Sequence, residues 1–139
     1  MTDKRIAILT DATHFVGDAI AKRLSNDGYR VFAVDPVFSD ADRRTTFEAL
    51  AGNITALTHH HAADVVEHVM SEAGQIDLLA SNDAYPAIRA PLQDIASDAL
   101  RDTLEALVVK PFDFASHVVT HMKARKQGKI VFLTSAAPL

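Results

Sequence analysis

The stretch ILTDATHFVG at residues 8–17 decides the fold. A run of apolar and β-branched residues leads into a turn, and a helical pattern begins at Gly17. A turn of this kind that binds a dinucleotide needs one glycine for the tight turn, one for close approach of the backbone to the pyrophosphate and one for helix packing. When the turn is aligned on Thr10, Asp11 and Phe15 occupy the first two positions and only Gly17 remains. The stretch therefore predicts a strand, a turn and a helix, with side chains where a phosphate cradle has bare backbone.

The rest of the chain repeats this alternation of strand and helix. Continuous apolar strands between helices predict a parallel sheet covered on both faces, an α/β fold of the Rossmann-like, doubly wound type. Because the last strand is apolar and nothing follows to pair with it, residues 1–139 are expected to be the N-terminal part of one larger domain, truncated before a sixth strand. Strands are predicted at 6–10, 30–35, 54–58, 76–81 and 129–134, and helices at 17–26, 41–50, 62–73 and 97–126, the last interrupted near Pro111.

Composition narrows the class of protein. The 139 residues carry a net charge of −4 and no cysteine. The negative charge argues against nucleic acid or an anionic membrane as a partner. The absence of cysteine excludes disulfides, a thiol nucleophile and cysteine-ligated zinc. No apolar run is long enough to span a bilayer, and the N-terminal apolar run is too short for a signal peptide. A soluble, cytoplasmic protein is expected.

Three segments in register resemble one family. The pattern Thr10-x4-Phe15-x-Gly17 is followed by LLASNDAYP at residues 78–86 and by FLTSAAP, which contains Ser135. Together these resemble the halohydrin dehalogenases, relatives of the short-chain dehydrogenases that have lost the nicotinamide cofactor. In that family an aromatic residue replaces a glycine of the cofactor loop and helps to wall a small halide pocket.

The resemblance implies an activity and a set of site residues. Such a lyase converts a vicinal haloalcohol to an epoxide with release of halide, and small anions open epoxides in the reverse direction. Ser135 would hold the substrate oxygen, while the family's Tyr, thirteen residues after the Ser, and its Arg, four further on, would both lie beyond Leu139. Phe15 would line the pocket, with Thr10, Asp83 and Tyr85 lining or supporting it. No cofactor and no metal are expected, only a bound halide such as chloride or bromide.

The helical stretch 97–126 resembles the long interface helix through which the relatives form tetramers. A homotetramer is therefore expected. Within it, Leu107 falls where many dehydrogenases keep a catalytic Asn.

Several of these residues have simpler interpretations. Asp83 could orient a halide-binding loop by accepting backbone N–H bonds, or could be an ordinary turn residue. Ser135 could be a helix cap. The run His59–His61 invites a metal hypothesis, but consecutive residues on an extended chain point to opposite faces, so an exposed loop is favoured.

Two other functions remain open. Asp35 ends the second strand eighteen residues after Gly17, where an NAD enzyme binds the ribose hydroxyl, so an NAD(P)-dependent short-chain oxidoreductase is one alternative. With Phe15 in the turn, Asp35 is also readily explained as a residue that caps a loop. The other alternative is a non-catalytic Rossmann-like fragment, because the Tyr and the Arg are missing.

Overall fold

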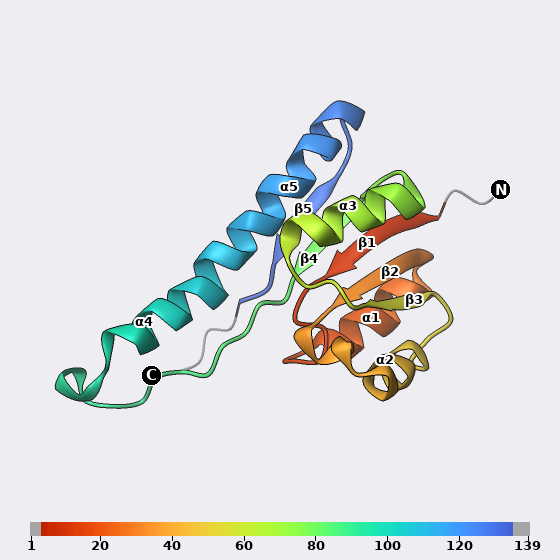
Figure 1. Cartoon of the computed structure of the whole chain (residues 1–139). Coiled ribbons are helices and arrows are strands. Elements are labelled where there is room, and N and C mark those ends of the chain that lie inside the picture. The colour runs from red at the N-terminus through yellow and green to blue at the C-terminus, as the bar shows by residue number, and fades with distance from the viewer. Residues whose placement is uncertain (1–3, 135–139) are drawn as a thin grey trace.

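The computed structural model describes residues 4–134 as a five-stranded sheet with helices on both faces (Figure 1). The strand order is β3–β2–β1–β4–β5, and every neighbouring pair is parallel. This confirms the predicted α/β class. The strands are β1 (Arg5–Leu9), β2 (Tyr29–Val34), β3 (Ile54–Leu57), β4 (Leu78–Ser81) and β5 (Lys129–Phe132).

The helices divide between the two faces of the sheet. In Figure 1, α1 and α2 lie on one face and α3 and α5 on the other. The sequence pattern missed two short 3-10 turns, which contain too few residues to show a helical period. The helical elements are α1 (Gly17–Asn26), η1 (Pro36–Ser39), α2 (Ala41–Glu48), α3 (Ala62–Ala73), η2 (Leu92–Asp94), α4 (Ser97–Leu104), η3 (Glu105–Val109) and α5 (Lys110–Arg125).

Each face of the sheet has its own hydrophobic core. Phe32, Val69 and Phe114 pack in the core beneath α3 and α5. Phe38 and Phe47 pack in the second core, beneath α1 and α2. Burial of apolar side chains on both faces explains why the strands read as continuous apolar runs rather than as alternating patterns.

The α-helical pattern of the long helix is interrupted next to Pro111, as the sequence predicts, but the helix does not end there. The five residues of η3 form a π-helical segment between α4 and α5, and the N–H of Lys110 donates to the carbonyl of Glu105. Pro111 has no N–H to donate, so the wider π turn directly before it lets the helix continue. The far end, α4, contributes no buried residue and stands away from the sheet (Figure 1).

The parallel register brings three strand ends to one edge. Leu9 of β1 lies level with Ala33 of β2 and with Ala80 of β4. Residues that follow these strands therefore meet at the carboxyl edge, where open α/β sheets bind ligands. Among residues 4–134, no helix is both long and apolar enough to cross a bilayer.

Candidate active site at the carboxyl ends of the strands

The turn after β1 keeps the backbone shape of a glycine-rich turn without the glycines. Asp11 has a φ of 43° and Phe15 a φ of 51°. These are the two positions that the alignment on Thr10 assigns to glycine. Left-handed backbone is uncommon for residues other than glycine, and especially for bulky ones, and costs about 1–3 kcal/mol at each position. Surrounding contacts must therefore hold the turn.

The side-chain amide of Asn82, directly after β4, makes some of the hydrogen bonds that fix the turn. Its Nδ2 donates to the carbonyl oxygens of Asp11, at 3.1 Å, and of His14, at 2.9 Å. The backbone N–H of Asn82 donates to Thr10 Oγ1 at 3.1 Å. Thr10, expected to line or support the pocket, does not line it: Thr10 is fully buried beneath the turn, and its hydroxyl joins β1 to β4 in support of the turn.

Replacing Phe15 with glycine is expected to leave the free energy of unfolding unchanged or to raise it by up to about 1 kcal/mol. Glycine removes the strain at a φ of 51° and adds flexibility to the unfolded chain, and the two effects oppose each other. The ring is 61% exposed, so little burial is lost. Urea unfolding measures the change. The control is Val16→Gly, where φ is −106° and strain relief is absent, and a loss of about 0.5–1 kcal/mol is expected there. An equal loss in the two variants would contradict the strain argument.

A partly buried ion cluster joins the turn, the loop after β4 and the start of α5. Lys110 Nζ lies 2.5 Å from Asp11 Oδ1 and 3.2 Å from Asp83 Oδ1. Asp11 Oδ2 accepts the N–H of Ala84 at 3.0 Å, and Asp83 Oδ2 accepts the hydroxyl of Ser81. Burial alone would lower the pKa of Lys110, but the hydrogen bond and charge of Asp11, together with the charge of Asp83, raise that pKa above its usual value.

This cluster changes the expectation for Asp83. Within residues 4–134, Asp83 accepts no backbone N–H. The loop amide of Ala84 binds Asp11 instead. Lys110 is the residue that draws the Asp83 carboxylate inward, and the Asp83 side chain is only 3% exposed.

Asp35 is engaged by internal donors at the end of β2. Its Oδ2 accepts the Thr13 hydroxyl at 2.7 Å, the Thr13 N–H at 3.1 Å and His14 Nδ1 at 3.1 Å, while Oδ1 accepts the N–H of Val37 at 3.1 Å. Burial by itself would raise the pKa of Asp35, but these hydrogen bonds and the neighbouring imidazole lower it. The side chain caps η1 and ties the turn to β2, in keeping with the capping interpretation.

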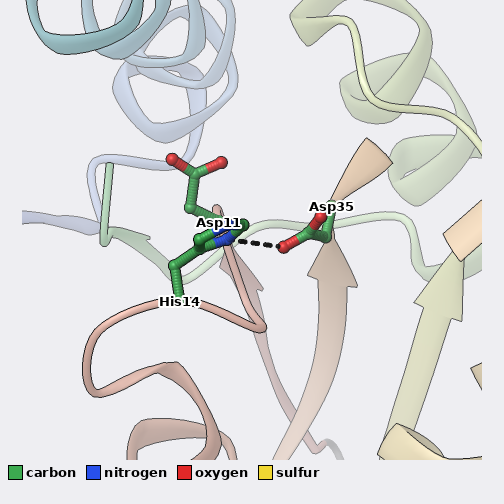
Figure 2. A group of neighbouring side chains, drawn as sticks. All are labelled: Asp11, His14 and Asp35. Atoms are coloured by element: carbon green, nitrogen blue, oxygen red, sulfur yellow. Dashed lines mark hydrogen bonds and ion pairs between the residues drawn. The ribbon is translucent and has the colours of Figure 1, made fainter. Parts of the chain in front are cut away.

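Figure 2 shows Asp11, His14 and Asp35 together, with ligand atoms within 4.8 Å of one another. The carboxylate of Asp11 points away from the pair formed by His14 and Asp35 (Figure 2). It is held by Lys110 and by the N–H of Ala84, and both oxygens of Asp35 already accept hydrogen bonds. The proximity of these three side chains is therefore explained by their own hydrogen bonds and ion pairs.

Phe15, Asp83 and Tyr85 line one cavity of about 500 Å³ between the turn, the loop after β4 and the end of β5. Ser81 was not predicted, although its place at the end of β4 beside Asp83 could have suggested it. Ser135 lies outside the described residues. The cavity is mostly apolar, and the described residues that line it are Phe15, Ser81, Asp83, Ala84, Tyr85, Ala87, Leu107, Pro111, Phe132, Leu133 and Thr134.

A second cavity, of about 410 Å³, lies on the other side of the ion cluster. Asp11 and Lys110 line it, together with His60 and His61 from the loop before α3. Tyr85 lines both cavities. The ion cluster and Tyr85 thus separate the two spaces.

Comparison with known proteins places this fold in a family. The family model described as short chain dehydrogenase matches residues 5–139, so the chain belongs to the short-chain dehydrogenase family. Among curated proteins, the 2-dehydro-3-deoxy-D-gluconate 5-dehydrogenase of Formosa agariphila is 26% identical over 139 residues, which cover 94% of this chain and 52% of that protein.

Among solved structures, two dehalogenases are similar to this chain. A dehalogenation enzyme is 35% identical with a TM-score of 0.89, and a halohydrin dehalogenase bound to ethyl (2S)-oxiran-2-ylacetate is 36% identical with a TM-score of 0.90. In both cases the match covers 96% of this chain and 55% of the solved chain. The chain thus spans about half the length of the relatives that it matches.

The curated relatives correct the expectation that the protein uses no cofactor. They are oxidoreductases and dehydrogenases, which points to a nucleotide cofactor. The described residues fit a dinucleotide only in part. The backbone angles at Asp11 and Phe15 suit a glycine-rich turn, but both residues carry side chains there, and the Asp35 carboxylate already accepts internal donors. A dinucleotide in the usual position would have to displace the ring and compete with those donors.

Proposed function

We propose that the whole protein is a halohydrin dehalogenase, which converts vicinal haloalcohols to epoxides with release of halide and opens epoxides with small anions in reverse. The observation that carries this proposal is Phe15, held in left-handed backbone at a glycine position of the turn and lining a mostly apolar cavity. The identity of 35% and 36% to two solved dehalogenases supports it, compared with 23% and 29% for two of the curated oxidoreductases.

In the proposed reaction a Tyr beyond Leu139, aided by an Arg, takes the proton of the substrate hydroxyl. The resulting alkoxide forms a C–O bond to the adjacent carbon as the carbon–halogen bond breaks, and the halide leaves with the bonding electrons. Ser135 would hold the substrate oxygen. The apolar wall formed by Phe15, Leu107 and Phe132 would accommodate a large, weakly hydrated halogen.

The test is release of bromide from a vicinal bromoalcohol by the full-length protein. We expect turnover, and we expect Phe15→Ala to lower kcat/KM by about tenfold, because a large part of the cavity wall is removed. Leu92→Ala is the control, since Leu92 is 86% exposed, lies outside the long helix and does not line the cavity; a change within about twofold is expected. Absence of bromide release by the unmodified protein would contradict the proposal.

The second candidate function is an NAD(P)-dependent short-chain oxidoreductase. The curated relatives and the glycine-like backbone angles at Asp11 and Phe15 favour it. The same assay separates the two functions when it is run with and without NAD(P). Formation of NAD(P)H with no bromide release would favour the oxidoreductase.

We also propose that the protein assembles as a homotetramer through the long helix. Large apolar side chains on this helix are exposed in the single chain, which is typical of a surface that another molecule covers. Light scattering on the full-length protein would measure the assembly, and a monomer would contradict this proposal. The exposed side chains are Leu100, Leu104, Leu107, Val108, Val109, Phe112 and Val119.

A further inference from the structure

Lys110 occupies a central position between the two cavities. It is the first residue of α5, and its ammonium lies between the carboxylates of Asp11 and Asp83. Asp11 is part of the strained turn that carries Phe15, and Asp83 lines the cavity that contains the Phe15 ring. One side chain on the long helix therefore connects both walls of the proposed substrate cavity.

We propose that Lys110 is a positioning residue of this cavity: its ammonium holds the carboxylates of Asp11 and Asp83 in place and offsets part of their charge, and so makes the cavity compatible with a leaving halide. The inference rests on the proposed function, because it assumes that the ligand beside Asp83 is an anion. Neither sequence motifs nor the family resemblance pointed to this residue.

The argument begins with the hydroxyl of Ser81. Ser81 lines the cavity and donates its hydroxyl proton to Asp83, so the Asp83 carboxylate sets the direction of that hydroxyl. Lys110 fixes the orientation of the Asp83 carboxylate that receives this proton. The contacts therefore run from Lys110 on α5 to Asp83 and from Asp83 to Ser81 in the cavity wall. Without the ammonium, the Asp83 carboxylate and the Ser81 hydroxyl would no longer be held in one orientation.

The second step is the local charge. With Lys110, the two carboxylates and the ammonium give the cluster one net negative charge. Without it, two buried carboxylates face each other beside the cavity and repel a halide. Two such carboxylates cannot both stay ionised easily, so one of them takes up a proton as the pH falls. That uptake restores a single negative charge, and halide affinity should return with it.

Other titratable groups near Lys110 could also change bromide affinity with pH. Asp11 faces it from the turn and Asp83 from the loop after β4. The cavity that Lys110 itself lines also contains, among the described residues, His60, His61, Tyr85, Asp102, Glu105 and Asp113. These six groups are present in wild type and in every Lys110 variant, and Lys110→Arg, which keeps them and the charge, serves as the reference for their contribution.

The experiment measures bromide affinity of the full-length protein against pH, by calorimetry, in wild type and in Lys110→Met. The bromide affinity of the wild-type protein should vary little from pH 8 down to the lowest pH at which the protein stays folded. The variant should bind bromide about tenfold more weakly at pH 8 and recover as the pH is lowered. Lys110→Arg should bind as wild type does. Lys123→Met, the same change on the exposed part of α5, is the control and should have no effect.

If Lys110→Met fails to fold, a second variant in which the lost charge is balanced still tests the proposal. Lys110→Met combined with Asp11→Asn keeps one net negative charge, leaves no pair of facing carboxylates and preserves the acceptor of the Ser81 hydroxyl, so we expect bromide binding with little pH dependence. Equal bromide affinity in wild type and Lys110→Met at all pH values would overturn the role of Lys110 while leaving the proposed function intact. Recovery of affinity at high rather than low pH would also overturn it.

If the wild-type protein neither binds nor releases bromide, the proposed function fails, and carboxyl NMR then tests the charge role alone. In Lys110→Met, one carboxyl of the pair should titrate at a clearly higher pH than in wild type. Unchanged titration of both carboxyls would reject the charge role as well.

Discussion

Replacing Gly17 with alanine is expected to lower the free energy of unfolding by about 3 kcal/mol, at the upper end of the range for overpacked sites. A Cβ at this position would lie 2.1 Å from the carbonyl oxygen of Ala12 and 2.6 Å from its carbon. Both neighbours are backbone atoms, which cannot rotate away as a flexible side chain can. The first turn of α1 would have to move away from the turn after β1, and the contacts that hold Asp11 and Phe15 would be disturbed.

Urea unfolding of Gly17→Ala and of a matched control measures this effect. The control is Gly52→Ala, because a Cβ there meets no atom within 4 Å. Its change should stay within about 0.5 kcal/mol. Equal effects at the two glycines would show that the close packing of α1 on the turn does not constrain residue 17.

Replacing Asp35 with alanine is the second change with a large expected effect, a loss of about 3 kcal/mol of unfolding free energy. The N–H groups of Thr13 and Val37, the hydroxyl of Thr13 and the imidazole of His14 all bind this carboxylate, whose side chain is fully buried. Truncation leaves several partly buried donors without an acceptor, and each such group costs about 1–3 kcal/mol. Asp98→Ala is the control, because that carboxylate is 90% exposed and a change within about 0.5 kcal/mol is expected.

The Asp35 carboxylate also predicts a direction of pH dependence. Its pKa in the folded protein is lowered from the ordinary value of about 3.9. A carboxyl with a lowered folded pKa stabilises the fold fully above its unfolded pKa, and this contribution is lost as the pH falls through the folded pKa. The difference in unfolding free energy between wild type and Asp35→Ala should therefore be constant near pH 7 and shrink below about pH 4. A difference that grows on acidification would contradict this assignment.

The sequence pattern predicted the sheet because parallel strands buried on both faces have continuous apolar runs, as residues 31–34 and 78–80 show. It also placed Asp11 and Phe15 at the glycine positions of the turn, and the positive φ of both residues agrees with that alignment. Local signals of this kind extend over a few residues, so they can be read without knowledge of the tertiary structure.

The ion cluster could not be predicted in the same way. Lys110 and Asp11 are separated by 99 positions, and neither residue belongs to a motif that refers to the other. The interruption near Pro111 was predicted, but its form as a π-helical segment was not, because that form depends on backbone hydrogen bonding rather than on residue type. For Thr10 the sequence left open whether it lines or supports the pocket, because a polar residue at a strand end can either face a ligand or join two strands; in the structure it joins two strands.

The most direct test of the proposed function is the location of bromide in crystals of the full-length protein, read from its anomalous scattering. The proposal predicts a bromide peak in the cavity lined by Phe15, Leu107 and Phe132. It also predicts that a bound epoxide lies beside the same peak. Absence of bromide from this cavity, together with a dinucleotide bound across the turn at Asp11 and Phe15, would contradict the proposal and establish the oxidoreductase alternative.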